Sequence, residues 1–156
     1  MSCALWFTAD SETPCNYSLW YYNYINEGDN SRVFKIKLFA RFARRERIPD
    51  INLCEAISRA ERGIVDADVG GDIIKQRVPR KGTGRSGDYR TLIAYNSGIR
   101  AVFLYGFAKS ERGNIEDNEL AELREIAAIW LNATDERIQQ QIEKSLLQEI
   151  NCNEAK

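Results

Sequence analysis

Hydrophobic and polar residues alternate, or recur at helical spacing, along most of the chain. Alternation over residues 33–37 (VFKIK) predicts a half-buried strand. Apolar residues then fall on one side of a helix that starts at Leu38 and that Pro49 ends. A second helix, capped by Asp50 and stopped at Gly63, completes a predicted helical hairpin.

The second half of the chain predicts three strands and two more helices. The strands are expected over 73–78, 89–95 and 101–107. The last of these is apolar on both faces, so we expect it inside the sheet. One helix should begin near Asn114 or Asp117, and a final one should run from Thr134 to Ile150 with a narrow apolar stripe.

The order β-α-α-β-β-β-α-α predicts an α+β fold, in which a twisted antiparallel sheet of about four strands carries an N-terminal helical hairpin and C-terminal helices. Residues 1–32 show no sustained period, and we expect a poorly ordered, dispensable extension with Val33 as a candidate alternative start. The main domain is expected over 33–132, and a C-terminal helical extension over 133–156.

Several classes of protein are disfavoured by what the chain lacks. It has no apolar run long enough for a membrane span and no basic start of a secretion signal, so we expect a cytoplasmic protein. Four cysteines without a C-x-x-C pair and without any histidine disfavour zinc and predict reduced thiols, Cys54 being a packing residue. Asp66, Asp68 and Asp72 lie near a Gly-Gly turn, but no second ligand cluster supports a metal, and no cofactor is expected.

The near-neutral net charge hides a strong asymmetry. Residues 1–32 carry a net charge of −3, residues 33–113 carry +8 and residues 114–156 carry −6. A basic body between acidic ends favours a polyanionic partner, although solvated helices can also account for part of the charge.

The basic excess is densest between Lys75 and Arg112, where nine bases meet two acids. Period two places Lys75 and Arg77 on one face of a strand. Taken alone they are ordinary exposed strand residues, but their clustering with Arg90 favours a phosphate-binding role. The glycine-rich stretch 79–87 (PRKGTGRSG) lacks the G-K-[ST] of a Walker A loop, which disfavours binding of nucleoside triphosphates. Its Arg80, Lys81 and Arg85 are predicted to bind a phosphate backbone rather than to catalyse.

The stretch IIKQRVPRKGTGRSGDYRTLIAY, followed by YGFAKSERGNI, resembles the RelE/HigB branch of the RelE/ParE toxins of bacterial toxin–antitoxin pairs. The resemblance runs from Val33 to about Cys152. It implies a toxin that cuts mRNA, in a ribosome-dependent manner, and that a cognate antitoxin of helix-turn-helix type inhibits. It also implies that the catalytic residues lie on the concave basic face: Lys75, Arg77, Arg90, Lys109 and Arg112.

The absence of histidine restricts the chemistry independently of any family. Cleavage through the 2′-OH needs a base, positive charge on the phosphorane and an acid at the leaving 5′-oxygen. Arginines can hold the phosphate but are poor proton donors, so Lys109 is the candidate acid of a metal-independent endoribonuclease. Tyr89 and Tyr95 are predicted core residues rather than base-stacking platforms.

An alternative function is a non-catalytic nucleic-acid or partner-binding module of the same fold, such as a ParE-like gyrase poison. The antitoxin is expected to bind along the N-terminal helices or along the stripe formed by Ile138, Ile142 and Leu146.

Overall fold

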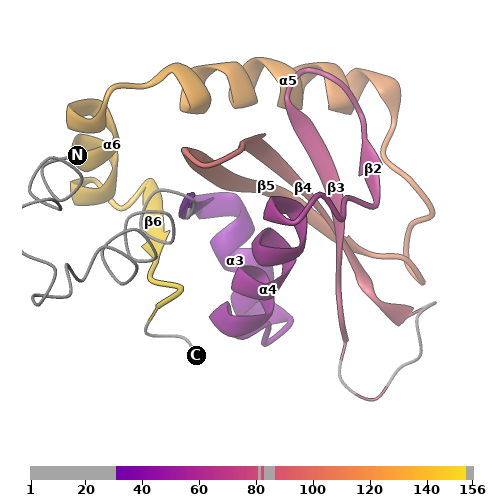
Figure 1. The fold of residues 1–156 in the computed structure, drawn as a ribbon. Helices are drawn as coiled ribbons and strands as arrows, with labels where there is room; N and C mark the ends of the chain where they lie inside the picture. The colour runs from indigo at the N-terminus through magenta and orange to yellow at the C-terminus, as the bar shows by residue number, and fades with distance from the viewer. Residues whose placement is uncertain (1–30, 81, 83–86, 154–156) are drawn as a thin grey trace, which may run out of the picture. The chain divides into compact units, whose positions relative to one another are not determined.

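The computed structural model describes residues 31–80, 82 and 87–153, and this part folds as a sheet with helices on both faces (Figure 1). The strands are β1 (Arg32–Ile36), β2 (Ala67–Asp68), β3 (Ile73–Val78), β4 (Tyr89–Asn96), β5 (Arg100–Ala108) and β6 (Leu147–Ile150). The helices are α3 (Lys37–Arg45), α4 (Asp50–Glu61), α5 (Asp117–Asn132) and α6 (Asp135–Glu143). The predicted α+β class is confirmed.

The sheet is larger than expected and is mixed. Its strand order is β2-β3-β4-β5-β1-β6. Strand β1 runs parallel to β5, whereas the other neighbouring pairs are antiparallel. The apolar strand β5 has a partner on each side, as its two apolar faces predicted.

Each face of the sheet is covered by its own pair of helices. Helices α3 and α4 bury Phe39 and Leu53 against Phe103 of β5. On the other face, Ala127 of α5 and Ile138 of α6 are fully buried, in a cluster that also contains residues of β1, β3, β4 and β5. We call these the α3/α4 face and the α5/α6 face. Because a strand alternates its side chains, a residue's parity decides which face it joins.

The predicted final helix over 134–150 is wrong in its second half. Thr134 caps α6 as expected, accepting a hydrogen bond from the Arg137 N–H, but the helix ends at Glu143. Ser145 has a φ of 60° and reverses the chain into β6, which pairs with the free edge of β1. The four-residue spacing of the apolar residues fits a helix. A longer α6, however, would leave the backbone N–H and C=O groups on the edge of β1 without partners, and β6 provides those partners.

Two predicted helix caps also differ. Asp50 is the first residue of α4 rather than its cap, and its carboxylate binds Lys35 at 2.9 Å instead. Helix α5 is capped by neither Asn114 nor Asp117. Glu116 and Glu119 form a reciprocal capping box there.

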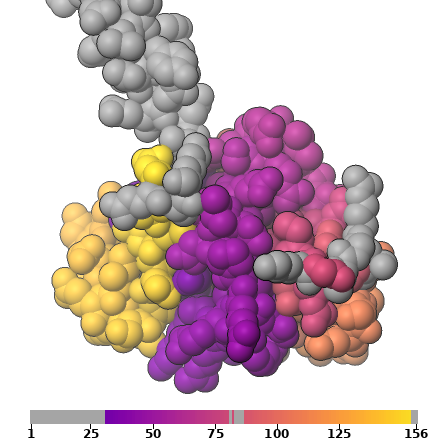
Figure 2. Space-filling model, turned by 90° about the horizontal axis from the view of Figure 1, so that it is seen from below, coloured from indigo at the N-terminus to yellow at the C-terminus, as the bar shows by residue number. Residues whose placement is uncertain are grey.

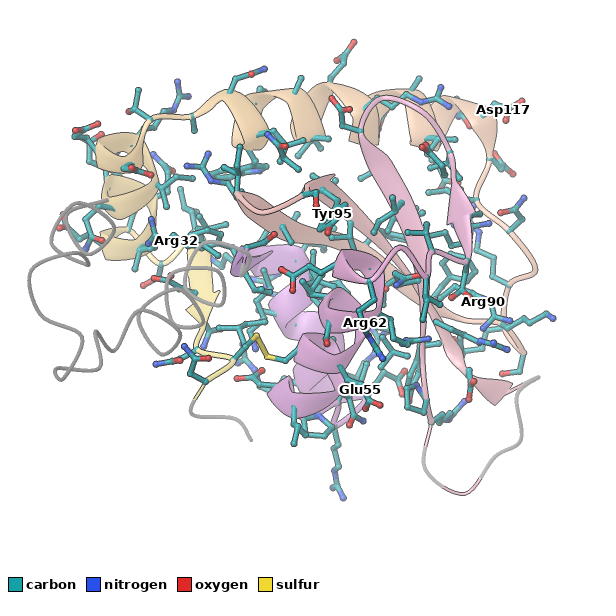
Figure 3. The ribbon with its side chains drawn as sticks, viewed as in Figure 1. Arg32, Glu55, Arg62, Arg90, Tyr95 and Asp117 are labelled. Atoms are coloured by element: carbon teal, nitrogen blue, oxygen red, sulfur yellow. A yellow bond between two sulfur atoms is a disulfide. The ribbon has the colours of Figure 1, made fainter. Side chains whose placement is uncertain are left out.

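Cys54 and Cys152 form a disulfide, which contradicts the predicted reduced thiols (Figure 3). Cys54 lies on α4, and Cys152 lies two residues after the end of β6. They are 98 residues apart in sequence, with Cα atoms 5.5 Å apart. Only the pairing of β6 with β1 brings them together, so sequence spacing carries no signal for this bond.

The predicted core position of Tyr89 is confirmed. The residue is only 3% exposed, in the core under α3 and α4.

No helix in the described part of the chain is long and apolar enough to cross a membrane.

Candidate nucleic-acid interface

Basic side chains gather on the α5/α6 face, beyond the part of the sheet that α5 buries. Lys75 and Arg77 lie on β3, and Arg77 is directly opposite Arg90 on β4. All three are half-buried. Lys75 and Arg77 have the same parity as Ile73 on β3, and Arg90 has the same parity as Leu92 on β4. Both Ile73 and Leu92 belong to the apolar cluster beneath α5. Figure 3 shows Arg90 at the side of the ribbon where α5 begins at Asp117.

A second segment brings another cation to this face. After β5 the chain turns, and the Arg112 Nε donates a 2.8 Å hydrogen bond to the Asn114 carbonyl oxygen. The Lys75 Nζ donates to the side-chain oxygen of the same asparagine, also at 2.8 Å. Asn114 therefore connects Arg112 to β3. We call Lys75, Arg77, Arg90 and Arg112 the cationic cluster.

Arg112 is held by an acid and a phenol. Its guanidinium forms a bidentate ion pair with the Glu119 carboxylate, and its Nη1 also donates a 3.2 Å hydrogen bond to the Tyr105 hydroxyl. This ion pair lowers the pKa of the Glu119 carboxyl, with the Glu116 backbone N–H adding to the effect. The same carboxylate raises the pKa of Arg112. Glu119 thus occupies the position of a counter-anion for one member of the cluster.

Arg90 has an unsatisfied donor. Its Nη1 is buried and has no hydrogen-bond partner, a condition that among the described residues is shared only by the Ser31 hydroxyl. A buried donor on a charged group is costly when unpaired. Arg77, its neighbour across the strands, has the carboxylate of Asp88 at 3.9 Å. Directly opposed side chains have Cβ atoms about 5 Å apart, so the two guanidinium groups repel each other.

The other predicted RNA-contacting residues are less tightly placed. Arg80 packs over the Tyr89 ring, 5.4 Å from its centroid. Lys81 and Arg85 lie outside the described residues. Lys109 is exposed in the turn after β5, and no hydrogen bond or ion pair of its side chain joins it to the described part of the cluster. The structure therefore brings together four of the five predicted catalytic residues.

One base of the sequence cluster belongs to the scaffold. Arg100 is 6% exposed and donates to the carbonyl oxygens of Trp130 and Ala133, while it also pairs with Asp135. It fastens the end of α5 to the sheet. The aspartates considered for a metal are also structural where the structure shows their partners: Asp66 accepts from the Arg77 N–H and Asp68 from the Gly70 N–H. No group able to hold a metal ion occurs within the described residues.

Sequence reasoning missed Tyr105, Asn114 and Glu119. The register shift between Leu92 and Ile93 changes the parity of β5, so simple alternation does not place Tyr105 opposite Leu92. The E-x-x-E spacing from Glu116 to Glu119 was a readable signal for the capping box. For Asn114 the sequence predicts only a role as a helix cap.

A mixed sheet with a half-buried cationic cluster on one face defines a small α+β protein suited to binding anions. Comparison of the sequence with known families identifies it further: residues 31–150 match the family described as the RelE toxin of the RelE/RelB toxin–antitoxin system. The chain belongs to this RelE toxin family. Neither the search of curated proteins nor the search of solved structures found a match.

Proposed function

We propose that this toxin is an endoribonuclease that cuts mRNA on the ribosome, in the manner of the RelE/HigB branch, and that a cognate antitoxin, of helix-turn-helix type, inhibits it. The observation that carries the proposal is the unpartnered Nη1 of Arg90 within a cluster of four cations. A phosphate oxygen would give that donor an acceptor and would offset the repulsion between Arg77 and Arg90.

The cluster suits a phosphate that gains charge during reaction. In the proposed step, the 2′-oxygen attacks phosphorus, the bond to the 5′-oxygen breaks, and a 2′,3′-cyclic phosphate and a 5′-hydroxyl form. The 2′-OH proton passes to a base and the leaving oxygen receives a proton from an acid. Arg77, Arg90 and Arg112 stabilise the phosphorane as fixed charges.

Three side chains are candidates for the two proton transfers, one as the base at the 2′-OH and two as the acid at the leaving 5′-oxygen. Lys75 is held by Asn114 within the cluster and is our candidate at the 2′-OH. Lys109 remains the candidate acid from the sequence, and the Tyr105 hydroxyl beside Arg112 is the competitor that the structure adds. The variants Lys75→Met, Lys109→Met and Tyr105→Phe separate them, since loss of an acid or base shifts one limb of the pH–rate profile.

Arg80, Lys81 and Arg85 are proposed to bind the RNA backbone, because stretch 79–87 connects β3 and β4, the strands that carry most of the cluster.

The apolar stripe predicted to bind the antitoxin is only partly accessible. Ile138 is fully buried and is not available to a partner, whereas Leu146 is 42% exposed.

The decisive experiment follows mRNA during induced expression of the toxin. Primer extension on a translated message should show new ends, and purified protein with ribosomes should yield 2′,3′-cyclic phosphate and 5′-hydroxyl products with EDTA present. An Arg90→Ala protein that cleaves at the wild-type rate would contradict the proposal. Gyrase-dependent DNA damage without RNA cleavage would favour the gyrase poison instead.

A further inference from the structure

A second group of cations lies on helix α3 and in the turn directly after it. Lys37, Arg41, Arg44 and Arg47 are all exposed. None of the four takes part in an ion pair within the described residues, although Arg45 beside them pairs with Glu46 at 3.7 Å. We call these four residues the α3 surface.

The charges of the α3 surface work against the helix that carries them. Lys37, Arg41 and Arg44 are spaced by four and three residues, so they are neighbours on one side of α3 and repel one another. Lys37 is also the first residue of α3, where the helix dipole disfavours a cation, and the first turn contains no acid. Residues that destabilise the element carrying them are expected mainly at functional positions, so the repelling cations of α3 suggest a function for this surface.

The α3 surface borders a hollow of about 650 Å³ between α3 and the α6–β6 turn. In Figure 2 the purple surface of α3 and α4 lies directly beside the yellow surface of the C-terminal segment. Lys37, Arg41 and Arg44 line one side of the hollow, and Leu147 and Glu149 line the other.

The acids near this hollow already have partners. Glu149 binds Arg32 through two hydrogen bonds of 3.0 and 3.1 Å. Lys35, which also lines the hollow, is only 8% exposed and pairs with Asp50. The positive charge of the α3 surface is therefore not neutralised by the carboxylates around it.

We propose that the α3 surface binds the phosphodiester backbone of a structured RNA. Arg41, Arg44 and Arg47 recur every three residues and suit a run of repeated phosphates, because each guanidinium can contact a phosphate through two N–H groups. An acidic peptide would need apolar anchors as well. Leu147, which lines the hollow, is only 2% exposed, and Leu38, which is 58% exposed on α3, does not line it.

The α3 surface and the cationic cluster are on opposite faces of the sheet. Lys75, Arg77 and Arg90 lie on the α5/α6 face, whereas α3 packs on the other. A short single strand held by the cluster cannot also cover α3. The RNA at α3 is thus a separate segment, as in a ribonucleoprotein that encloses the toxin. This inference rests on the proposed function for its choice of RNA.

The test compares two pairs of substitutions of equal charge. Arg41→Gln with Arg44→Gln removes two cations of the α3 surface, and Arg62→Gln with Arg137→Gln removes two exposed cations elsewhere. Binding is measured by fluorescence anisotropy with purified 70S ribosomes and with a 2′-O-methyl RNA hexanucleotide. We expect the α3 variant to bind ribosomes roughly 10- to 100-fold more weakly, with a salt slope reduced by about 1.5 units, and to bind the hexanucleotide as wild type does. The control pair should keep both affinities.

The outcomes separate this proposal from the proposed function. Equal ribosome binding by the two variants would overturn the role of the α3 surface, whether or not the toxin cleaves RNA. Polyglutamate serves as a third probe, for an acidic peptide partner. If the α3 variant binds polyglutamate more weakly than wild type but binds ribosomes equally well, the proposal is also overturned. Loss of ribosome binding in the α3 variant supports it, even if the wild-type protein leaves mRNA intact and the nuclease proposal fails. A melting temperature at or above that of wild type confirms that the variant folds, since repulsion is relieved.

Discussion

Reduction of the Cys54–Cys152 disulfide should destabilise the fold strongly. The bond links α4 to Cys152, two residues after the end of β6, which is the edge strand next to β1. Strand β6 has only four residues and pairs with β1 alone. Without the bond, the C-terminal segment is held to the body by that short pairing and by the contacts of α6.

The size of the effect follows from the length of chain that the bond closes. A crosslink between residues 98 positions apart restricts the unfolded chain by about 4.7 kcal/mol in the loop-entropy treatment. This value is an upper bound, because real unfolded chains are already partly compact. At about 3 to 5 °C per kcal/mol for a domain of this size, the melting temperature should fall by about 10 to 20 °C.

The assay is thermal unfolding followed by circular dichroism, with and without dithiothreitol. Wild-type protein should lose stability in the reductant, whereas Cys152→Ala should melt at one low temperature in both conditions. Because Cys3 and Cys15 are present in both proteins, they cannot produce this difference. The reasoning fails if the reductant lowers both melting temperatures equally, or if peptide mapping of the oxidised protein finds Cys54 and Cys152 as free thiols.

Four further predictions concern the site and its surroundings. Alanine at any member of the cationic cluster should slow cleavage by roughly ten- to a thousandfold in single-turnover assays. Arg90→Ala, which removes a buried donor without a partner, should do so without lowering the melting temperature. Arg80→Ala should mainly weaken RNA binding and reduce its salt slope by about one unit, and an unchanged slope would argue against a phosphate contact. The pKa of Glu119 is lowered in the folded state, so its contribution to stability is present above the ordinary carboxyl pKa and is lost as pH falls through the lowered value. Glu119→Gln should remove that part of the acid dependence in unfolding curves, and an identical pH profile would show that the ion pair does not stabilise the fold. Deletion of residues 1–30 should preserve cleavage, provided that the cut leaves Arg32, whose guanidinium binds Glu149.

Much of the fold could be predicted from local patterns. The helices α3, α4 and α5 and the strands β3, β4 and β5 follow from apolar spacing, because each carries a regular apolar pattern on the face or faces that it buries. The grouping of Lys75, Arg77 and Arg90 followed from strand parity, and Arg112 from the family resemblance. These features depend on neighbours within a few residues, which a single sequence contains.

The remaining features depend on contacts between distant parts of the chain. Strand β6 forms because β1 has a free edge, and the disulfide forms because β6 lies there. In the sequence, Arg100 falls within the basic cluster. In the structure it is buried, and its guanidinium donates to three acceptors at the end of α5 and the start of α6. The placement of Tyr105 depends on a register shift that alternation cannot reveal.

The charge asymmetry of the sequence acquires a structural meaning through the acidic C-terminal part. Asp135 and Glu149 pair with Arg32, Asp135 also pairs with Arg100, and Glu119 pairs with Arg112. These carboxylates act as counter-anions where bases join the elements of the fold. They leave the Arg90 Nη1 without an acceptor and the α3 surface without an ion pair. Arg90 and the α3 surface are thus among the described cations that the acidic part does not pair, and they lie on the two faces of the sheet where we propose that RNA binds. Glu119 already pairs with Arg112, so a phosphate that binds Arg112 has to compete with this carboxylate.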